Sequence, residues 1–188
     1  MSKHHSVLGG VALALALILT GCSDDSTDPD ATDTPTATPT ETPTSASPAP
    51  KTPEEKAAAQ LTAYLGVRDD AFRAATIDFK RLNKVATGDE FLQVQARVAD
   101  LDLYKIKVTG EYVHTLSDPR PRTAKKFIIT DCEDRSGVKE MKGGKEVPPA
   151  QGPNGQPLGN PLPTHYTVVL EKGRWLVSEA DVRWEETC

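Results

Sequence analysis

The spacing of apolar residues changes twice along this chain of 188 residues. Residues 7–19 form an apolar run interrupted only by two glycines, residues 23–50 contain no Leu, Ile, Val, Phe, Trp or Tyr, and regular apolar patterns begin after residue 51. The pattern therefore divides the chain into 1–21, 22–50 and 51–188. Only the third part has the apolar content and the length that the core of a single domain requires.

Residues 52–101 carry apolar residues at the spacing of helices. A helix start is predicted at Thr52, because threonine caps a helix, Pro53 fits the first helical position and Glu55 completes a capping box. We expect this helix to reach about Ala75, a second to cover about 78–85, and a third to run from 89 to about 101. The apolar face of the first helix holds Ala57, Leu61, Tyr64, Leu65, Phe72 and the stem of Arg68.

From residue 104 the apolar period becomes two, which is typical of strands. One long strand is predicted over 104–116, with a bulge or bend at Gly110, and others over 122–132, 164–171 and 174–184. Residues 143–163 hold 5 Gly and 6 Pro, so we expect a flexible loop there rather than a functional one. Helices followed by an antiparallel meander predict an α+β fold, with N-terminal helices packed on a four-stranded antiparallel sheet.

The N-terminal apolar run has the length of a signal-peptide core and is too short to span a bilayer. Lys3 precedes it, and Leu19-Thr20-Gly21-Cys22 resembles a bacterial lipobox. The resemblance implies cleavage before Cys22 and diacylation of its thiol, and two acyl chains anchor a protein stably. We therefore expect a lipid-anchored protein on the extracytoplasmic face of the cell membrane. An ordinary secretory signal that happens to end in a cysteine is the alternative.

Residues 23–50 contain 8 Thr, 6 Pro, 4 Ser and 6 acidic residues. Such a segment buries too little apolar surface to fold, so residues 22–50 are predicted to be a lipidated cysteine followed by a disordered tether. An extended, proline-rich chain of this length reaches ~85 Å. A bare spacer and a stalk carrying O-linked sugars are both open.

Charge and cysteines narrow the picture further. Lys plus Arg number 22 and Asp plus Glu 27, but one base and six acids precede residue 51, which leaves a formally neutral domain. This balance argues against a nucleic-acid partner. With Cys22 acylated, the simplest pairing in an oxidising compartment is a Cys132–Cys188 disulfide; free thiols or a metal pair are the alternative. We expect no metal site and no cofactor, because metal-binding spacings and a phosphate-binding loop are missing.

His114 is the most interesting candidate for chemistry. It lies in register with Tyr112 and with Ile106, Val108 and Leu116 on the apolar face of the first predicted strand. A buried imidazole near Asp131 or Asp70 would be suited to general-base catalysis. A partly exposed histidine at a strand end is the plainer interpretation. His165, at the start of the third strand, is a weaker candidate.

Other polar and aromatic residues also have two interpretations. Asp131, Glu133 and Asp134 suggest a cation site, but we favour a solvated strand end, because calcium-loop spacing is missing. Asp69 and Asp70 lie between two arginines, which favours surface ion pairs. Trp175 and Trp184 are interpreted as packing residues, with sugar stacking as the alternative.

The sequence also resembles a known family. Val-Ala-Thr-Gly-Asp at 85–89, Ile-Thr-Asp-Cys-Glu-Asp at 129–134, Gly-Arg-Trp-Leu-Val at 173–177, the terminal cysteine and the order of elements are similar to actinobacterial lipoproteins with a nuclear-transport-factor-2-like domain. The resemblance covers most of 54–188. It implies a cone, in which a curved sheet wraps around helices and often encloses an apolar pocket, and it allows a homodimer formed through the sheet. Catalytic members use a His-Asp pair or an Asp with a Tyr, and these motifs do not align with this chain.

Together these features favour a non-catalytic binding or accessory module of the cell envelope, with an apolar small ligand or an envelope protein as partner. One alternative is a small pocket enzyme of isomerase or dehydratase type that uses His114, with Tyr112 beside it. The other is a structural or interaction protein of an envelope complex. Fold resemblance alone does not choose among these.

Overall fold

The computed structural model describes residues 52–148, 151–152 and 155–188. The predictions for the signal peptide, for Cys22 and for the tether lie outside the described residues. Of the helices in the described part of the chain, none combines the length and the apolar character that crossing a membrane requires.

Three helices come first among the described residues, as predicted. They are α1 (Pro53–Ala74), α2 (Phe79–Leu82) and α3 (Gly88–Leu103). The predicted capping box is present, because Thr52 Oγ1 accepts a hydrogen bond from the Glu55 backbone and Glu55 accepts one from the Thr52 backbone. Helix α2 is shorter than predicted. The chain leaves it after Leu82 so that Ala86 can form a parallel bridge with Val177.

In the described part of the chain, eight strands follow and form two sheets. The strands are β1 (Ile106–Thr109), β2 (Val113–Leu116), β3 (Arg120–Thr123), β4 (Lys126–Asp134), β5 (Lys139–Lys142), β6 (Lys145–Glu146), β7 (Leu162–Glu171) and β8 (Arg174–Val182). One sheet has the order β2-β4-β7-β8, with β3 also paired to β4, and the other has the order β1-β5-β6. All strand pairs within the two sheets are antiparallel.

The α+β class is confirmed, but three strand predictions are wrong in detail. The single strand predicted over 104–116 is two strands in different sheets, since Gly110 turns the chain with φ +86° and β1 pairs with β5 while β2 pairs with β4. The strand predicted over 122–132 is the β3–β4 hairpin. The segment 143–163, predicted to be a loop, contains β6 and the first residues of β7.

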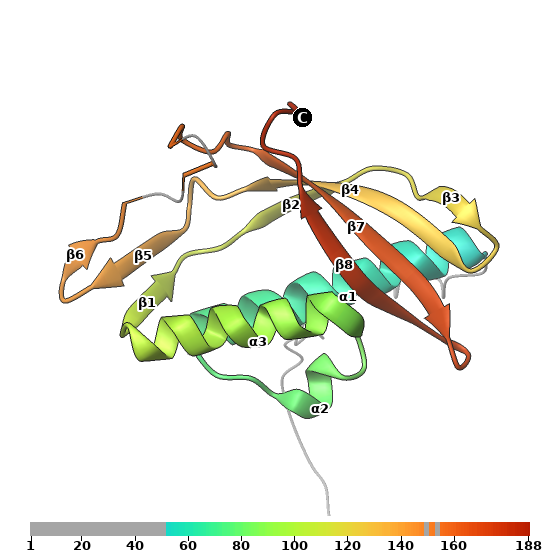
Figure 1. Ribbon diagram of the computed structural model, residues 1–188, viewed down its shortest axis with the longest axis horizontal. Coiled ribbons are helices and arrows are strands. Elements are labelled where there is room, and N and C mark those ends of the chain that lie inside the picture. The colour runs from blue at the N-terminus through green and yellow to red at the C-terminus, as the bar shows by residue number, and fades with distance from the viewer. Residues whose placement is uncertain (1–51, 149–150, 153–154) are drawn as a thin grey trace, which may run out of the picture. The chain divides into compact units, whose positions relative to one another are not determined.

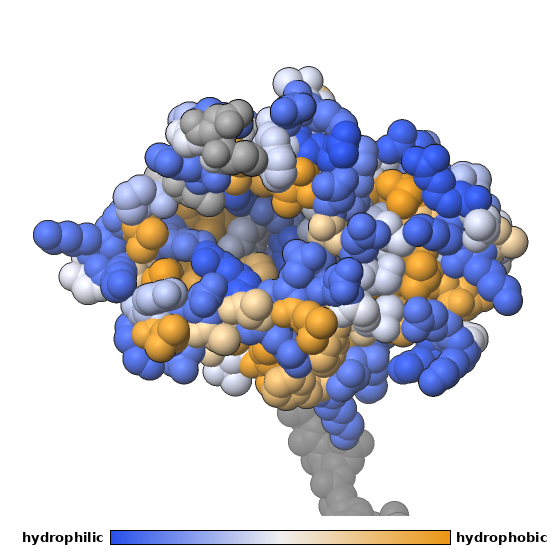
Figure 2. All heavy atoms as spheres, viewed as in Figure 1, coloured by the Kyte–Doolittle hydropathy of each residue, from blue (hydrophilic) through white to orange (hydrophobic). Residues whose placement is uncertain are grey.

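The apolar core lies between the helices and one face of the larger sheet. In Figure 1 the long strands β4, β7 and β8 curve over α1 and α3, which lie side by side, while β5 and β6 lie at the end away from the β7–β8 turn. A register shift after Thr167 accompanies the bend of the β7–β8 pair. Fully buried members of the core include Leu61, Leu65, Leu82, Phe127, Ile129, Val168 and Val177. Figure 2 shows polar side chains over most of one face, broken by smaller apolar patches, with a hollow above α3.

Candidate functional site

A cluster of charged and polar side chains fills the space between α1 and the concave face of the larger sheet. We call it the interior cluster; its members are Arg68, Asp69, His114, Asp131, Glu133 and Tyr166. Helix α1 supplies the first two, β2 supplies the histidine, β4 supplies the next two and β7 supplies the tyrosine. Strand β4 places its two acids here because every second residue of it is buried, from Phe127 to Glu133.

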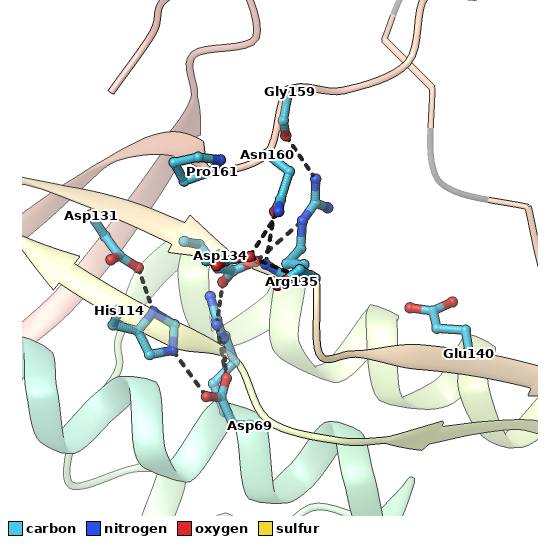
Figure 3. Close-up of polar contacts among 12 residues, drawn as sticks. Asp69, His114, Asp131, Asp134, Arg135, Glu140, Gly159, Asn160 and Pro161 are labelled. Atoms are coloured by element: carbon cyan, nitrogen blue, oxygen red, sulfur yellow. Dashed lines mark hydrogen bonds and ion pairs between the residues drawn. The ribbon is translucent and has the colours of Figure 1, made fainter.

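His114 lies between two carboxylates (Figure 3). Its Nδ1 is 2.7 Å from Oδ2 of Asp131, and its Nε2 is 3.0 Å from Oδ2 of Asp69. An imidazole with a carboxylate at each nitrogen donates from both, which requires the protonated ring. Burial alone would lower the pKa of His114, but the hydrogen bonds to Asp131 and Asp69 outweigh it and raise this pKa to about 9. At neutral pH the ring is therefore an imidazolium.

Arg68 is the second cation of the cluster. Its guanidinium donates to Oδ1 of Asp69 from Nε and Nη2, at 2.9 and 2.8 Å, and also to Glu133 and to the Tyr166 hydroxyl. The rings of Phe72 and Tyr112 lie 5.7 and 5.5 Å from its central carbon. With only 7% of the residue exposed, Arg68 is almost entirely enclosed by its own partners.

Asp69 joins the two cations. Burial raises the pKa of this carboxyl, but hydrogen bonds from His114 and Arg68 outweigh burial and hold it below the usual range. One oxygen of Asp69 serves Arg68 and the other serves His114. Three carboxylates thus face two cations, and the pairing uses both nitrogens of the imidazolium.

A second buried pair extends the polar interior to α3. The Tyr64 hydroxyl donates to Oε1 of Glu90, and the rings of Tyr64 and Tyr166 are 5.8 Å apart. Burial raises the pKa of Glu90, and the bond from Tyr64 and the charge of Arg68 offset this only in part. Oε2 of Glu90 has no hydrogen-bond partner among the described residues.

The cluster also contains a set of potential metal ligands. Ligand atoms of His114, Asp131 and Glu133 lie within 4.8 Å of one another. Metal coordination needs a neutral imidazole with a free lone pair, whereas both nitrogens of His114 are directed at carboxylates. The donor geometry fits an ion-paired imidazolium better than a metal ligand.

The structure therefore brings some predicted site residues together and separates others. Asp131 is the neighbour of His114, but the helical partner is Asp69 rather than Asp70, which is exposed and binds Arg73 and Arg81. The predicted surface pairing holds for Asp70 and is wrong for Asp69, which is 5% exposed. Tyr112 stacks beside His114 with ring centroids 6.4 Å apart.

The solvated strand end predicted for β4 is wrong for two of its three acids. Asp131 is 0% and Glu133 8% exposed, because both point to the helices. Asp134 points the other way, where Oδ1 accepts hydrogen bonds from the Asn160 amide and the Ser136 backbone (Figure 3). The interior of the cone consequently holds a charged cluster where the family resemblance implies an apolar pocket. Two cavities among the described residues, of about 210 and 370 Å³, have no cluster residue in their lining.

The remaining candidates lie outside the cluster. His165 of β7 is 3.5 Å from Glu186. Trp175 packs against Phe127 with ring centroids 5.3 Å apart, and Trp184 is 44% exposed. The predicted Cys132–Cys188 disulfide is confirmed, with Cα atoms 5.8 Å apart.

Sequence reasoning missed Glu90, and it missed Arg68 and Asp69 as site residues. A signal for Arg68 was present, because a charge at the spacing of Leu61, Tyr64 and Leu65 places its head group over the buried face. Asp69 had no such signal, since the width of the buried face depends on what packs against the helix. Glu90 lies one residue before the apolar pair at 91–92. The structure shows that it points inward, because Val94, Val98 and Leu101 are buried on the same face of α3.

Comparison with known proteins gives likeness in fold only. No family model matches the sequence, and no curated protein matches it. The solved structures that it resembles include the intermembrane-space region of the chloroplast protein ARC6, at 13% identity and a TM-score of 0.44, covering 71% of this chain and 98% of that one. A designed protein named Rd1NTF2_05 overlaps 69% of this chain and 99% of its own length at 11% identity and a TM-score of 0.35. A de novo β-sheet design solved by NMR overlaps 68% of this chain and 84% of its own at 16% identity and a TM-score of 0.31.

Proposed function

We propose that this chain is a lipid-anchored extracytoplasmic protein that acts as a non-catalytic binding or accessory module of the cell envelope. The observation that carries the non-catalytic part is the state of His114, whose two nitrogens are each held by a carboxylate. A general base needs a free lone pair near the working pH. His114, with a pKa of about 9, lacks one at neutral pH.

The other charged groups of the interior support the same proposal. Arg68 binds Asp69, Glu133 and Tyr166, so its donors are engaged within the protein. Buried charges that are paired in this way favour one packing arrangement of helix and sheet, and they are not free to bind a substrate. Function then depends on the outer surface, where a ligand or an envelope protein would bind.

The anchoring part of the proposal rests on the sequence. Lys3, the apolar run of 7–19 and the lipobox-like residues 19–22 occur in the order of a lipoprotein signal, and a Thr/Pro/Asp-rich segment follows. Together with the resemblance to actinobacterial lipoproteins, this order supports attachment of residues 51–188 to the membrane through Cys22 and a tether. A homodimer and a partner protein on the same membrane are both compatible with this arrangement.

The anchor is tested by labelling cells that express the full chain with a palmitate analogue. We expect label on the wild-type chain and on Cys188→Ser, which keeps Cys22, and none on Cys22→Ser. Label that persists on Cys22→Ser would overturn the assignment of the acylated residue. A wild-type chain without label would contradict the lipid anchor and favour the alternative, an ordinary secretory signal.

The non-catalytic assignment is tested by measuring the titration of His114 by NMR in the full chain. An imidazolium that keeps its proton to about pH 9 supports the proposal. The enzyme alternative retains one favourable observation, the carboxylate of Asp131 at 2.7 Å. A His114 that titrates near pH 6 to 7 would favour that alternative, because the ring would then be available as a base.

A further inference from the structure

A groove on the outer surface is lined by cations and a tryptophan. It lies between the first turns of α1, the segment after α2 and the start of β8, and its volume is about 370 Å³. We call it the basic groove; its lining residues are Lys56, Ala59, Gln60, Lys84, Arg174 and Trp175. Three of the six are cations and none is an acid, whereas residues 51–188 as a whole are formally neutral.

Among the described residues, the cations of the basic groove have no acidic partner in an ion pair. Lys56, Lys84 and Arg174 take part in none of the ion pairs formed by the described residues. Among the acids near these cations in the chain, Glu55 caps α1, and Glu171, the cross-strand neighbour of Arg174, accepts a hydrogen bond from Thr87 at 3.5 Å. The smaller cavity, by contrast, is lined by Asp70 and Asp78 together with Arg81.

The three walls of the basic groove are fixed to one another. Gln60 Nε2 donates to the Lys84 carbonyl at 3.0 Å, which joins α1 to the segment after α2. The same segment is joined to β8 by the bonds Val177 N to Val85 O and Thr87 N to Val177 O, of 2.9 and 2.8 Å. Trp175 is held by its contact with Phe127. Walls that are fixed before binding lower the entropic cost of holding a ligand.

We infer that the basic groove binds a phosphate ester carried on a small polyol, either as a lipid headgroup or as a free molecule. Ammonium and guanidinium groups form charge-assisted hydrogen bonds to phosphate oxygens, and a guanidinium does so with two bonds in parallel. The face of an indole packs against the apolar side of a sugar or glycerol unit. A groove with one tryptophan and three cations that form no ion pair with another described residue meets both requirements, and it is too small for a nucleic-acid track. This inference names the ligand class for the binding module proposed above and rests on that proposal.

The test uses the full chain, purified from membranes in neutral detergent. Two probes are used. One probe is sn-glycerol 3-phosphate, titrated by calorimetry with uncharged glycerol as its control. The other is phosphatidylglycerol incorporated into the detergent micelles. The binding variant is K56Q/K84Q/R174Q, and the matched control K80Q/K107Q/R122Q removes three exposed cations that lie outside the groove lining. Circular dichroism checks that both variants are folded.

We expect wild type and control to bind at least one probe alike, and the groove variant to bind about tenfold or more weakly. Binding of glycerol 3-phosphate identifies a free ester as sufficient, and binding of phosphatidylglycerol alone identifies the lipid headgroup as the ligand. Equal binding by all three chains, equal loss in both variants, or no binding of either probe by wild type would overturn the inference. Each of these results leaves the Cys22 and His114 tests unaffected. Consumption of the free ester would instead refute the non-catalytic proposal while supporting the groove as a site.

Discussion

His114 couples the stability of the domain to pH. Its folded pKa of about 9 lies above the unfolded value of about 6.5, so the folded chain binds the proton more tightly. The stability that this gives is complete below the unfolded pKa and is lost as pH rises through about 9. We expect the free energy of unfolding to fall between pH 6.5 and 9.5, by no more than about 3 kcal/mol from this group.

The measurement is denaturant unfolding at several pH values for wild type and for His114→Gln. The variant should be less stable at pH 6.5, and the difference between the two proteins should shrink towards pH 9.5. His165→Gln serves as control, because it leaves the cluster around His114 intact. A constant difference between wild type and His114→Gln across this range would contradict the ion-paired imidazolium.

Glu90 couples stability to pH in the same direction as His114, because its folded pKa is also raised. Its raised folded pKa means that its ionised form is disfavoured inside the protein, so its contribution to stability is lost as pH rises. Glu90→Gln keeps an acceptor for the Tyr64 hydroxyl and removes the charge. We expect this variant to be about 1 kcal/mol more stable at pH 7 and to gain little near pH 4.

Denaturant midpoints at the two pH values test this, with the exposed Glu54→Gln as the control. A Glu90→Gln chain that is less stable at pH 7 would instead mean that the carboxylate is needed to balance Arg68. In that case the Glu90 carboxylate would count as a further anion that offsets the cations of the interior cluster.

At the scale of elements, Gly110 decides how the strands are divided between sheets. It has φ +86°, and a Cβ added there would lie 1.9 Å from the Gly137 carbonyl oxygen. We therefore expect Gly110→Ala to destabilise the domain by more than about 2 kcal/mol, through both backbone strain and the close contact. Gly66→Ala is the matched control, because its Cβ meets nothing within 4 Å and it lies within α1.

The control should stabilise the domain by about 0.5–1 kcal/mol, because alanine favours a helix interior over glycine. Thermal unfolding of both variants distinguishes the two glycines. If Gly110→Ala has the melting temperature of the wild type, the turn between β1 and β2 tolerates a side chain. The close approach of Gly137 would then not determine the conformation of this turn.

These elements also show how far the sequence predicts the fold. The helix start at Thr52 and the bend at Gly110 were predictable, because each depends on the chemistry of a few adjacent residues. The assignment of β1 and β2 to different sheets was not, because it depends on pairing with β5, whose residues Lys139–Lys142 carry no apolar alternation. Local pattern identifies a strand, whereas its partner depends on long-range packing.

The candidate site was predictable to the same degree. Alternation on β4 places Asp131 and Glu133 on one face, and the register of β2 directs His114 towards the interior. Which helical acid meets this histidine depends on the rotation of α1 about its axis. Asp69 and Asp70 differ by about 100° around the helix, and only the packed structure distinguishes the buried acid from the exposed one.

At the scale of the whole molecule, the Cys132–Cys188 disulfide joins the last residue to the C-terminal part of β4 across a separation of 56 residues. Closing a loop of this length removes conformational entropy from the unfolded chain and stabilises the folded one by about 4 kcal/mol. We expect Cys188→Ser to lower the melting temperature by on the order of 10 °C. The last residues after β8 contribute little packing of their own, since residues 184–188 are exposed.

Comparing the single and double cysteine variants separates the effect of the disulfide on stability from the effect of the two side chains. Cys132→Ser, Cys188→Ser and the double variant should melt at nearly the same temperature, because each breaks the same loop. A reductant should bring wild type down to that temperature and leave the three variants unchanged. Additive losses in the double variant would mean that the partly buried Cys132 matters through packing rather than through the bond.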